Sequence, residues 1–278
     1  LGEGPRVRGR VAAAARLAER RTGITAALLD GRVVIITGAA RGVGKGIAAA
    51  VTERGATALL VDCDERSLGE TTAELTAAGR RVAPLVLDLR DPDSAERIVG
   101  TAVERWGAVH GLVNNAIATN EPKRFMEITR ADYDLVFDVG PRATFELMQA
   151  VHPVLLAGGG GSIVNLGSGS GTMGKPKFGA YAGAKEAIRG ISKVAALEWG
   201  RDNIRVNVVC PFAESDGIRA WREMAPDAYE RSLRGVPMGR LGDVSADIGP
   251  AVAFLLSDEA SFITAQTILV DGGAAGFR

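Results

Sequence analysis

One stretch decides the fold of this chain: Arg32-Val-Val-Ile-Ile-Thr-Gly-Ala-Ala-Arg-Gly-Val-Gly44. Its first six residues are mostly β-branched and apolar without alternation, which is typical of a parallel strand buried on both faces. Three glycines follow at positions 38, 42 and 44, and a helical pattern continues to about position 54. A strand, a glycine-rich turn and a helix in this order form a cradle for a pyrophosphate, because small residues admit the phosphates to the backbone and the helix N-terminus presents unpaired N–H groups.

The same rhythm of strands and helices continues along the chain. Strands are predicted over residues 32–37, 57–61, 81–87, 109–113, 162–166, 204–209 and 267–270. Helices are predicted over residues 44–54, 64–78, 92–106, 131–156, 181–200 and 247–256. This alternation indicates an α/β fold, a Rossmann-like doubly wound parallel sheet flanked by helices on both faces, whose ligands bind at the carboxyl ends of the strands.

Two segments depart from this rhythm. Gly140-Pro141 interrupts the helical pattern 131–156, and a kink is expected there because proline lacks the N–H that would bond the carbonyl of Phe137. The second segment, residues 212–237, is polar, aromatic and punctuated by proline, with helical patches at 218–224 and 226–233. Because it follows a strand end, it is predicted to be a lid over the ligand site.

We expect residues 29–278 to form a single domain, preceded by a basic N-terminal extension over residues 1–28. Within the extension, an Arg- and Ala-rich helical pattern runs over residues 5–21. One interpretation is an arm that packs on the domain or on a partner subunit. The alternatives are an organelle transit signal, a tag or disordered sequence.

Composition disfavours several classes of function. The 33 basic and 33 acidic residues cancel, so no overall field attracts nucleic acid or an anionic membrane surface. The chain contains no run of eighteen apolar residues that could span a bilayer. Cys63 and Cys210 are too few for a disulfide framework, and neither the cysteines nor the two histidines have metal-ligand spacing, so we expect no metal site and a reducing, cytoplasmic location.

Ser168, Tyr181 and Lys185 are the candidate catalytic residues. A four-residue step places Tyr181 and Lys185 on one face of a helix, and Ser168 follows the strand predicted at 162–166. A phenol with a pKa of about 10 is a poor acid or base at neutral pH, but an adjacent ammonium favours the phenolate and lowers that pKa. A tyrosine tuned in this way could exchange a proton with an oxygen that the serine hydroxyl also binds.

Four residues, Gly38, Asp62, Asp88 and Asn114, lie at predicted strand ends, where ligands of a doubly wound sheet gather. A carboxylate at Asp62 can accept hydrogen bonds from both adenosine ribose hydroxyls and repels a 2′-phosphate, which favours NAD over NADP. Arg41 in the glycine turn argues the other way, because an arginine there could pair with that phosphate.

Together and in this order, these motifs resemble the short-chain dehydrogenase/reductase family of the single-domain type, and most closely its 3-oxoacyl-carrier-protein reductase-like branch. The resemblance extends over roughly residues 29–273. The motifs that carry it are T-G-x-x-x-G-x-G at 37–44, Asp88, Asn114-Asn115-Ala116, Ser168 with Tyr181 and Lys185, Pro211, and Asp271-Gly-Gly.

The resemblance implies an NAD(P)(H)-dependent oxidoreductase that interconverts a secondary alcohol and a ketone by hydride transfer. Tyr181 would be the general acid or base, Ser168 would steady the substrate oxygen, and Lys185 would lower the tyrosine pKa and hold the nicotinamide ribose. Asp88 would contact the adenine and Asn115 the adenosine side of the cofactor. The implied cofactor-binding residues are Gly38, Arg41, Gly42, Val43, Gly44, Asp62, Asp88, Leu89, Asn115, Ala116, Tyr181, Lys185, Pro211 and Ser215. Family members are commonly oligomers whose subunits contact one another through their long helices, so the resemblance implies a homodimer or homotetramer.

The chain departs from the family pattern around the nicotinamide end. Gly140 stands where the family usually has an Asn that completes the catalytic set and holds a relay water near the lysine. Ile117 replaces the usual Gly of N-N-A-G, and Phe212 replaces a Gly that usually follows Pro211. Ser215 is the candidate substitute for a Thr that often contacts the carboxamide and phosphate.

Two hypotheses account for Gly140. In one, backbone carbonyls freed beside Pro141 hold the water and redox turnover persists. In the other, the protein is a non-redox or weakly active member, such as a dehydratase, a cyclase, an isomerase or a binding protein. An atypical small-molecule substrate is expected in either case. The candidate substrate-binding residues, mostly apolar or aromatic, are Ile117, Ser170, Thr172, Met173, Phe178, Phe212, Glu214, Trp221 and Met224.

Overall fold

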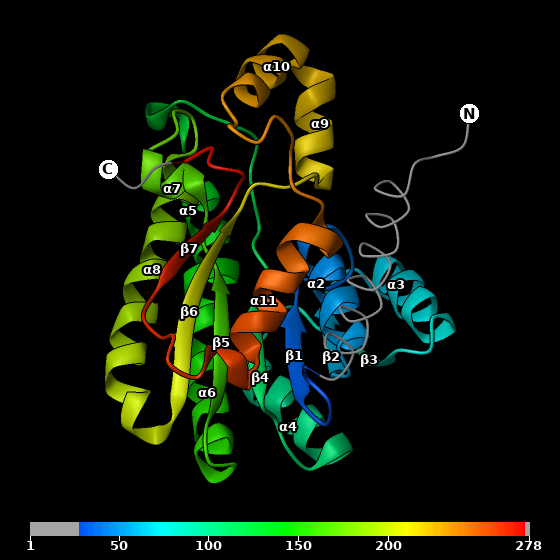
Figure 1. The fold of residues 1–278 in the computed structure, drawn as a ribbon. Helices are drawn as coiled ribbons and strands as arrows, with labels where there is room; N and C mark the ends of the chain where they lie inside the picture. The colour runs from blue at the N-terminus through cyan, green and yellow to red at the C-terminus, as the bar shows by residue number, and fades with distance from the viewer. Residues whose placement is uncertain (1–27, 276–278) are drawn as a thin grey trace, which may run out of the picture.

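The computed structural model describes residues 28–275, which form a seven-stranded sheet with helices packed against it (Figure 1). Every strand pairing is parallel, and the strand order is β3-β2-β1-β4-β5-β6-β7. The chain reverses its direction of travel across the sheet between β1 and β4, and ligands of such folds bind beside this switch point. The predicted fold class, a Rossmann-like doubly wound parallel sheet, is confirmed.

The strands lie close to their predicted positions. They are β1 (Val33–Thr37), β2 (Thr57–Asp62), β3 (Arg81–Val86), β4 (Gly111–Asn114), β5 (Gly161–Leu166), β6 (Ile204–Pro211) and β7 (Thr267–Val270). All five residues of β1 are buried, as its unbroken β-branched sequence predicts.

Helices cover both faces of the sheet (Figure 1). One face packs against α2 (Gly42–Glu53), α3 (Glu65–Ala77) and α11 (Gly249–Leu256). The other packs against α4 (Ser94–Trp106), α6 (Ala143–Ala157) and α8 (Gly179–Trp199). Val34 and Ile36 of β1 contribute to the first core and Ile35 to the second, because successive side chains of a strand point to opposite faces.

The helix predicted over 131–156 is interrupted at the expected residues. Helix α5 (Arg130–Phe137) continues through a π turn, Asp138–Arg142, into α6, and Gly140 and Pro141 are buried in the turn. Pro141 cannot donate a backbone hydrogen bond, and the wider π turn accommodates that break. A second π turn, Val244–Ile248, precedes α11, so the regular helix predicted from 247 begins at Gly249.

Two further helix starts can be compared with the predicted ranges. Helix α3 begins directly after Asp64, whose side chain accepts a hydrogen bond from Ser67 N at 3.1 Å and so caps the helix. The predicted start of α4 at position 92 was wrong: Ser94 N donates to the Asp91 carbonyl, which closes a turn, and Asp93 takes the N-cap position with a φ of 59°. The short helix α7 (Gly169–Met173) was not predicted, since its glycines and serines are typical of loops.

The segment predicted as a lid contains α9 (Asp216–Met224) and α10 (Pro226–Arg234), which stand together beyond the carboxyl end of β6 (Figure 1). Trp221 and Tyr229 join the two helices through an edge contact with ring centroids 5.7 Å apart. The Lys175 ammonium lies 4.6 Å from the Trp221 ring and 4.9 Å from the Phe178 ring. These cation–π contacts tie α9 to the segment that leads into α8.

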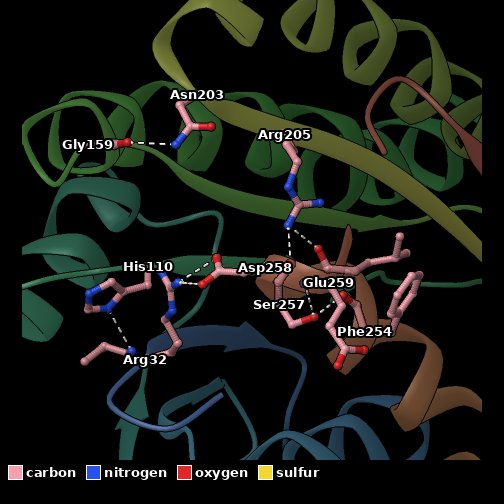
Figure 2. A network of polar contacts seen from close by, with 11 residues as sticks. Arg32, His110, Gly159, Asn203, Arg205, Phe254, Ser257, Asp258 and Glu259 are labelled. Atoms are coloured by element: carbon pink, nitrogen blue, oxygen red, sulfur yellow. Dashed lines mark hydrogen bonds and ion pairs between the residues drawn. The ribbon is translucent and has the colours of Figure 1, made fainter. Parts of the chain in front are cut away.

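The opposite end of the sheet, where the strands begin, is stabilised by two arginines, one in hydrogen bonds to backbone carbonyls and one in an ion pair (Figure 2). Arg205 of β6 donates to the carbonyls of Leu255 and Ser257 at 2.7 and 3.0 Å. Arg32, directly before β1, pairs with Asp258 at 2.5 Å. The chain after α11 is thereby attached to strands on both sides of the switch point.

Two sequence predictions concern the ends and the surface. The basic extension 1–28, including the helical pattern 5–21, lies outside the described residues except for Leu28. Within residues 28–275, none of the helices combines the length and the apolar character needed to cross a bilayer.

Candidate functional site

A cavity of about 480 Å³ opens at the carboxyl ends of the strands. It extends from the glycine turn after β1 to Tyr181 and Lys185 on α8. The predicted site residues that line it are Gly38, Arg41, Val43, Asp62, Asp88, Leu89, Asn115, Ala116, Ile117, Tyr181, Lys185, Pro211 and Ser215. The structure therefore brings most of the predicted cofactor-binding residues to one cavity.

The cavity also has walls that the sequence analysis missed. These are Val61, Cys63, Leu87, Arg90, Ala118, Leu135, Val139, Leu166 and Gly167. Most of them adjoin a predicted residue at a strand end, so the strand-end rule could have found them. Leu135 and Val139 come from α5 and the π turn, where no motif marks a ligand site.

Several predicted site residues lie outside the cavity wall. They are Gly42, Gly44, Ser168, Ser170, Thr172, Met173, Phe178, Phe212, Glu214, Trp221 and Met224. Phe212 is held by its backbone, because its N–H donates to the Val270 carbonyl and its carbonyl accepts from Gly242 N, both at 3.1 Å. Phe178 lies close to Tyr181, with the two ring centroids 6.2 Å apart in an edge contact.

The glycine turn is packed so closely at Gly38 and Gly44 that neither position has room for a side chain. Gly38 has a φ of 65°, and a Cβ there would lie 2.7 Å from Asn115 Nδ2. A Cβ at Gly44 would collide with the Gly38 carbonyl oxygen. Asn115 Nδ2 donates to the carbonyls of Thr37 and Gly38, each at 3.0 Å, so this amide fixes the turn against the end of β4.

Helix α2, which follows this turn, has no side chain that caps its N-terminus and no acidic residue in its first turn. Its N-terminal N–H groups and the positive end of its dipole face an anion site without competition from a carboxylate. The turn and the helix therefore fit the pyrophosphate of a dinucleotide.

Two carboxylates mark the far end of the cavity. Asp62 accepts hydrogen bonds from Ala40 N at 3.0 Å and Asp64 N at 3.1 Å, which fix its orientation. Asp88 is held by Arg90 at 2.6 Å, and hydrogen bonding to this guanidinium lowers the pKa of the Asp88 carboxyl. Asp62 is thus the better placed of the two to bind a neutral polyhydroxyl group.

The three candidate catalytic residues come from adjoining elements. Ser168 follows β5 and caps α7, where its Oγ accepts a hydrogen bond from Ser170 N at 3.1 Å. Tyr181 and Lys185 lie one turn apart on α8, and Lys185 Nζ is 5.8 Å from the tyrosine ring centroid. Lys185 is 2 % exposed, and its ammonium donates to the Leu166 carbonyl at 2.7 Å.

Burial dominates the ionisation of this group. It raises the pKa of the Tyr181 phenol, although a hydrogen bond with Ser168 acts in the opposite direction. Burial also lowers the pKa of Lys185 to about 8. The pKa of Tyr181 is therefore raised, not lowered as expected from the neighbouring lysine, because burial of the phenol outweighs its hydrogen bond with Ser168.

Cys210, the last residue but one of β6, lies beneath the same site. Its Sγ is 2.6 Å from the position that a Cβ at Gly167 would take, and burial raises the pKa of its thiol to about 11. The thiol therefore stays protonated at neutral pH and acts as packing. Among residues 28–275, no three His, Cys, Asp or Glu side chains lie close enough together to hold a metal ion.

Two of the departures from the family pattern, Gly140 and Ile117, lie next to each other in the structure. A Cβ at Gly140 would lie 2.6 Å from Ile117 Cδ1 and 3.9 Å from Ala184 Cβ. Ile117 follows β4 and lines the cavity, whereas Gly140 is buried in the π turn. The isoleucine side chain thus fills the space into which a side chain at position 140 would project.

Comparisons with known proteins agree on one class of enzyme. A family model described as enoyl-(acyl carrier protein) reductase matches residues 38–275. The 12alpha-hydroxysteroid dehydrogenase of a Clostridium species is 40% identical over 253 residues, which cover 88% of this chain and 97% of that enzyme. The 3-oxoacyl-[acyl-carrier-protein] reductase of Thermotoga maritima is 35% identical over 247 residues, which cover 88% and 98% of the two chains.

A solved structure shows the same architecture. Levodione reductase superposes with a TM-score of 0.83 at 31% sequence identity, over 88% of this chain and 98% of its own. The likeness therefore extends over most of the chain.

Proposed function

Because the chain belongs to the short-chain dehydrogenase/reductase family, whose relatives here are alcohol and ketone oxidoreductases, we propose that it interconverts a secondary alcohol and a ketone by hydride transfer with NAD(H). We further propose that Tyr181 is the general acid or base. The observation that carries this proposal is the continuous cavity that joins the glycine turn to Tyr181 and Lys185.

The glycine turn and the N-terminus of α2 would hold the pyrophosphate, and Asp62 the adenosine ribose. When bound, the nicotinamide supplies or accepts the hydride. The fixed carboxylate of Asp62 supports NAD, since it retains lone pairs for ribose hydroxyls and would repel a 2′-phosphate. Arg41 and Arg90 also line the cavity but pair with Asp64 and Asp88, at 3.2 and 2.6 Å.

The catalytic residues would handle the proton. In the direction of reduction, the Tyr181 hydroxyl would donate its proton to the substrate oxygen while the Ser168 hydroxyl hydrogen-bonds the same oxygen. The raised pKa of Tyr181 keeps the phenol protonated at neutral pH, which is the form that reduction needs. Lys185 would hold the nicotinamide ribose through the Nζ protons that the Leu166 carbonyl does not use.

Tyr181→Phe tests this proposal. The substitution removes the proton donor and keeps the ring, so kcat for ketone reduction should fall roughly 10²- to 10⁴-fold while the NADH dissociation constant changes little. Tyr133→Phe is the matched control, because Tyr133 lies on the surface of α5. The assay is NADH absorbance over a panel of ketones, with NADH and NADPH binding followed by fluorescence.

The same measurements distinguish the alternative function. A wild type that binds NADH but reduces no ketone and oxidises no alcohol of the panel would contradict the redox proposal and favour a non-redox or binding role. Tighter binding of NADPH than of NADH would contradict only the role given to Asp62.

The wider organisation is part of the same proposal. We propose that residues 29–278 act as one domain whose lid, near 212–237, closes over a small-molecule substrate. We also propose a cytoplasmic homodimer or homotetramer that binds neither nucleic acid nor membrane.

A further inference from the structure

At the wall of the cavity, the Ile117 side chain fills the space into which a side chain at position 140 would project. The Ile117 Cδ1 methyl lies 2.6 Å from the position of a Cβ at Gly140, closer than two carbon atoms can approach. Any side chain at position 140 must therefore displace this methyl. The two residues come from different elements, the loop after β4 and the π turn between α5 and α6.

Ile117 is held in this position from behind. It packs against a buried apolar cluster formed by Val136 of α5 and Ala180 and Ala184 of α8. Ala184 directly precedes Lys185, and Ile117, Tyr181 and Lys185 all line the same cavity. The Ile117 side chain thus contacts both the π turn and α8, the helix that carries Tyr181 and Lys185.

We propose that Ile117 is a positioning residue that acts through Lys185. Its side chain fills the space beside Gly140 and keeps water and polar side chains of the π turn away from the catalytic pair, Tyr181 and Lys185. The inference rests on the proposed redox function and deepens it. It predicts that Ile117 and Gly140 work as a matched pair, so that a side chain at 140 is tolerated only when position 117 is made smaller.

The charges around Lys185 are consistent with this role. The titratable groups that face the lysine are Tyr181 on its own helix and Cys210 near the end of β6. Asp138 and Arg142 of the π turn pair with each other at 2.9 Å. Burial lowers the pKa of Lys185, and removing the Ile117 side chain should relieve that effect.

Four variants test the pairing: Gly140→Ala, Gly140→Asn, Ile117→Ala and the double variant Ile117→Ala/Gly140→Asn. Gly140→Asn should push Ile117 into the cavity and lower kcat roughly tenfold or more, with a smaller loss for Gly140→Ala. The double variant should recover most of that loss. Gly190→Ala is the control, because Gly190 lies on α8 with no atom within 4 Å of an added Cβ.

Ile117→Ala supplies a readout that packing alone would not move. Water admitted beside Lys185 should raise the pKa of its amine, about 8 in the wild type, by about half a unit or more, and the pH profile of kcat/KM should shift with it. The same amine is followed by ¹³C NMR of Lys side chains, assigned with Lys185→Met. Thermal unfolding checks that each variant is folded at the assay temperature.

Independent effects of the two substitutions, with no recovery in the double variant, would overturn the pairing, as would an unchanged Lys185 titration in Ile117→Ala. The Lys185 titration does not depend on the proposed reaction, since NMR measures it without turnover. If the wild type turns over no alcohol or ketone yet Ile117→Ala raises the pKa of Lys185, the redox proposal fails while the role of Ile117 stands.

Discussion

At the scale of single residues, Lys185 separates what spacing predicts from what packing decides. The four-residue step from Tyr181 predicts that both side chains share one face of a helix, and the structure confirms it. The step does not reveal that the face is pressed against β5 and β6, which leaves the lysine 2 % exposed. The predicted direction of the tyrosine pKa shift was wrong because burial, which raises the pKa of Tyr181, outweighs the hydrogen bond with Ser168, which lowers it.

The buried amine gives a testable dependence of stability on pH. The pKa of Lys185 is about 8 in the folded chain and 10.5 for an ordinary lysine, so between these values the unfolded chain binds more protons and stability rises with pH. From pH 7 to pH 9 the wild type should gain about 1 kcal/mol of unfolding free energy relative to Lys185→Met. Urea unfolding at both pH values measures it.

The upper pH limit of that experiment matters because the contribution of Cys210 to stability falls as pH rises, whereas that of Lys185 increases. Its thiol keeps its proton up to a pKa of about 11 in the folded chain against 9.0 for an ordinary cysteine, so it costs stability as pH rises through that range. Cys210→Ser in both backgrounds removes this contribution. Parallel changes in the wild type and Lys185→Met would show that the amine is solvated.

At the scale of helices and strands, the sequence predicted the elements well where local signals are strong. An unbroken β-branched run predicts β1, and an Asp followed by helical periodicity predicts the start of α3. The break at Gly140-Pro141 was predicted from the proline. Its π geometry and the contact between Gly140 and Ile117 could not be predicted, because they depend on how α5 and α8 pack around the loop after β4. Helix α7 was missed because tertiary contacts, rather than propensity, stabilise its five residues.

The contact between the lid and the segment before α8 gives the prediction at this scale. The Lys175 ammonium contacts two rings, that of Phe178 before α8 and that of Trp221 on α9. Lys175→Met removes two cation–π contacts, so KM for the substrate should rise roughly threefold to tenfold while the NADH dissociation constant stays nearly unchanged. Steady-state kinetics and Trp fluorescence measure the two effects.

Lys193→Met is the control for this variant, because Lys193 is an exposed lysine of α8. An equal loss of substrate and cofactor binding in Lys175→Met would mean that the lysine stabilises the site as a whole. An unchanged KM would mean that α9 does not close over the substrate.

At the scale of the whole molecule, the two ends of the sheet have different tasks. The ends where strands begin are bound to one another through Arg32, Arg205 and the chain after α11 (Figure 2). The carboxyl ends instead surround a cavity whose walls come from loops, the π turn and α8. Substitutions such as Ile117 and Gly140 can therefore change the site without disturbing the frame that holds it.

The outer surfaces of α6 and α8 are the candidate interface of the proposed oligomer. Phe145 and Leu156 of α6 are each 48% exposed, and Val194 and Leu197 of α8 are 56% and 77% exposed. Exposed apolar side chains on two neighbouring helices are typical of a surface that another subunit covers. Leu197→Glu should therefore shift a wild-type dimer or tetramer toward a smaller species, because the carboxylate would lose its hydration in the interface.

Light scattering coupled to size exclusion, over a range of protein concentrations, measures this shift. Met126→Glu is the control, since Met126 is 92% exposed but lies outside α6 and α8, on the 3₁₀ turn Phe125–Glu127. If Leu197→Glu leaves the mass of a wild-type oligomer unchanged while Met126→Glu reduces it, the interface lies over the entrance to the site instead. That result would couple subunit contact to the neighbouring segment Asn120–Asp132, whose Lys123 and Asp132 pair at 2.7 Å. Such an assembly would place the second subunit beside Tyr181, because Gly179 and Ala180 line the same groove as Phe125.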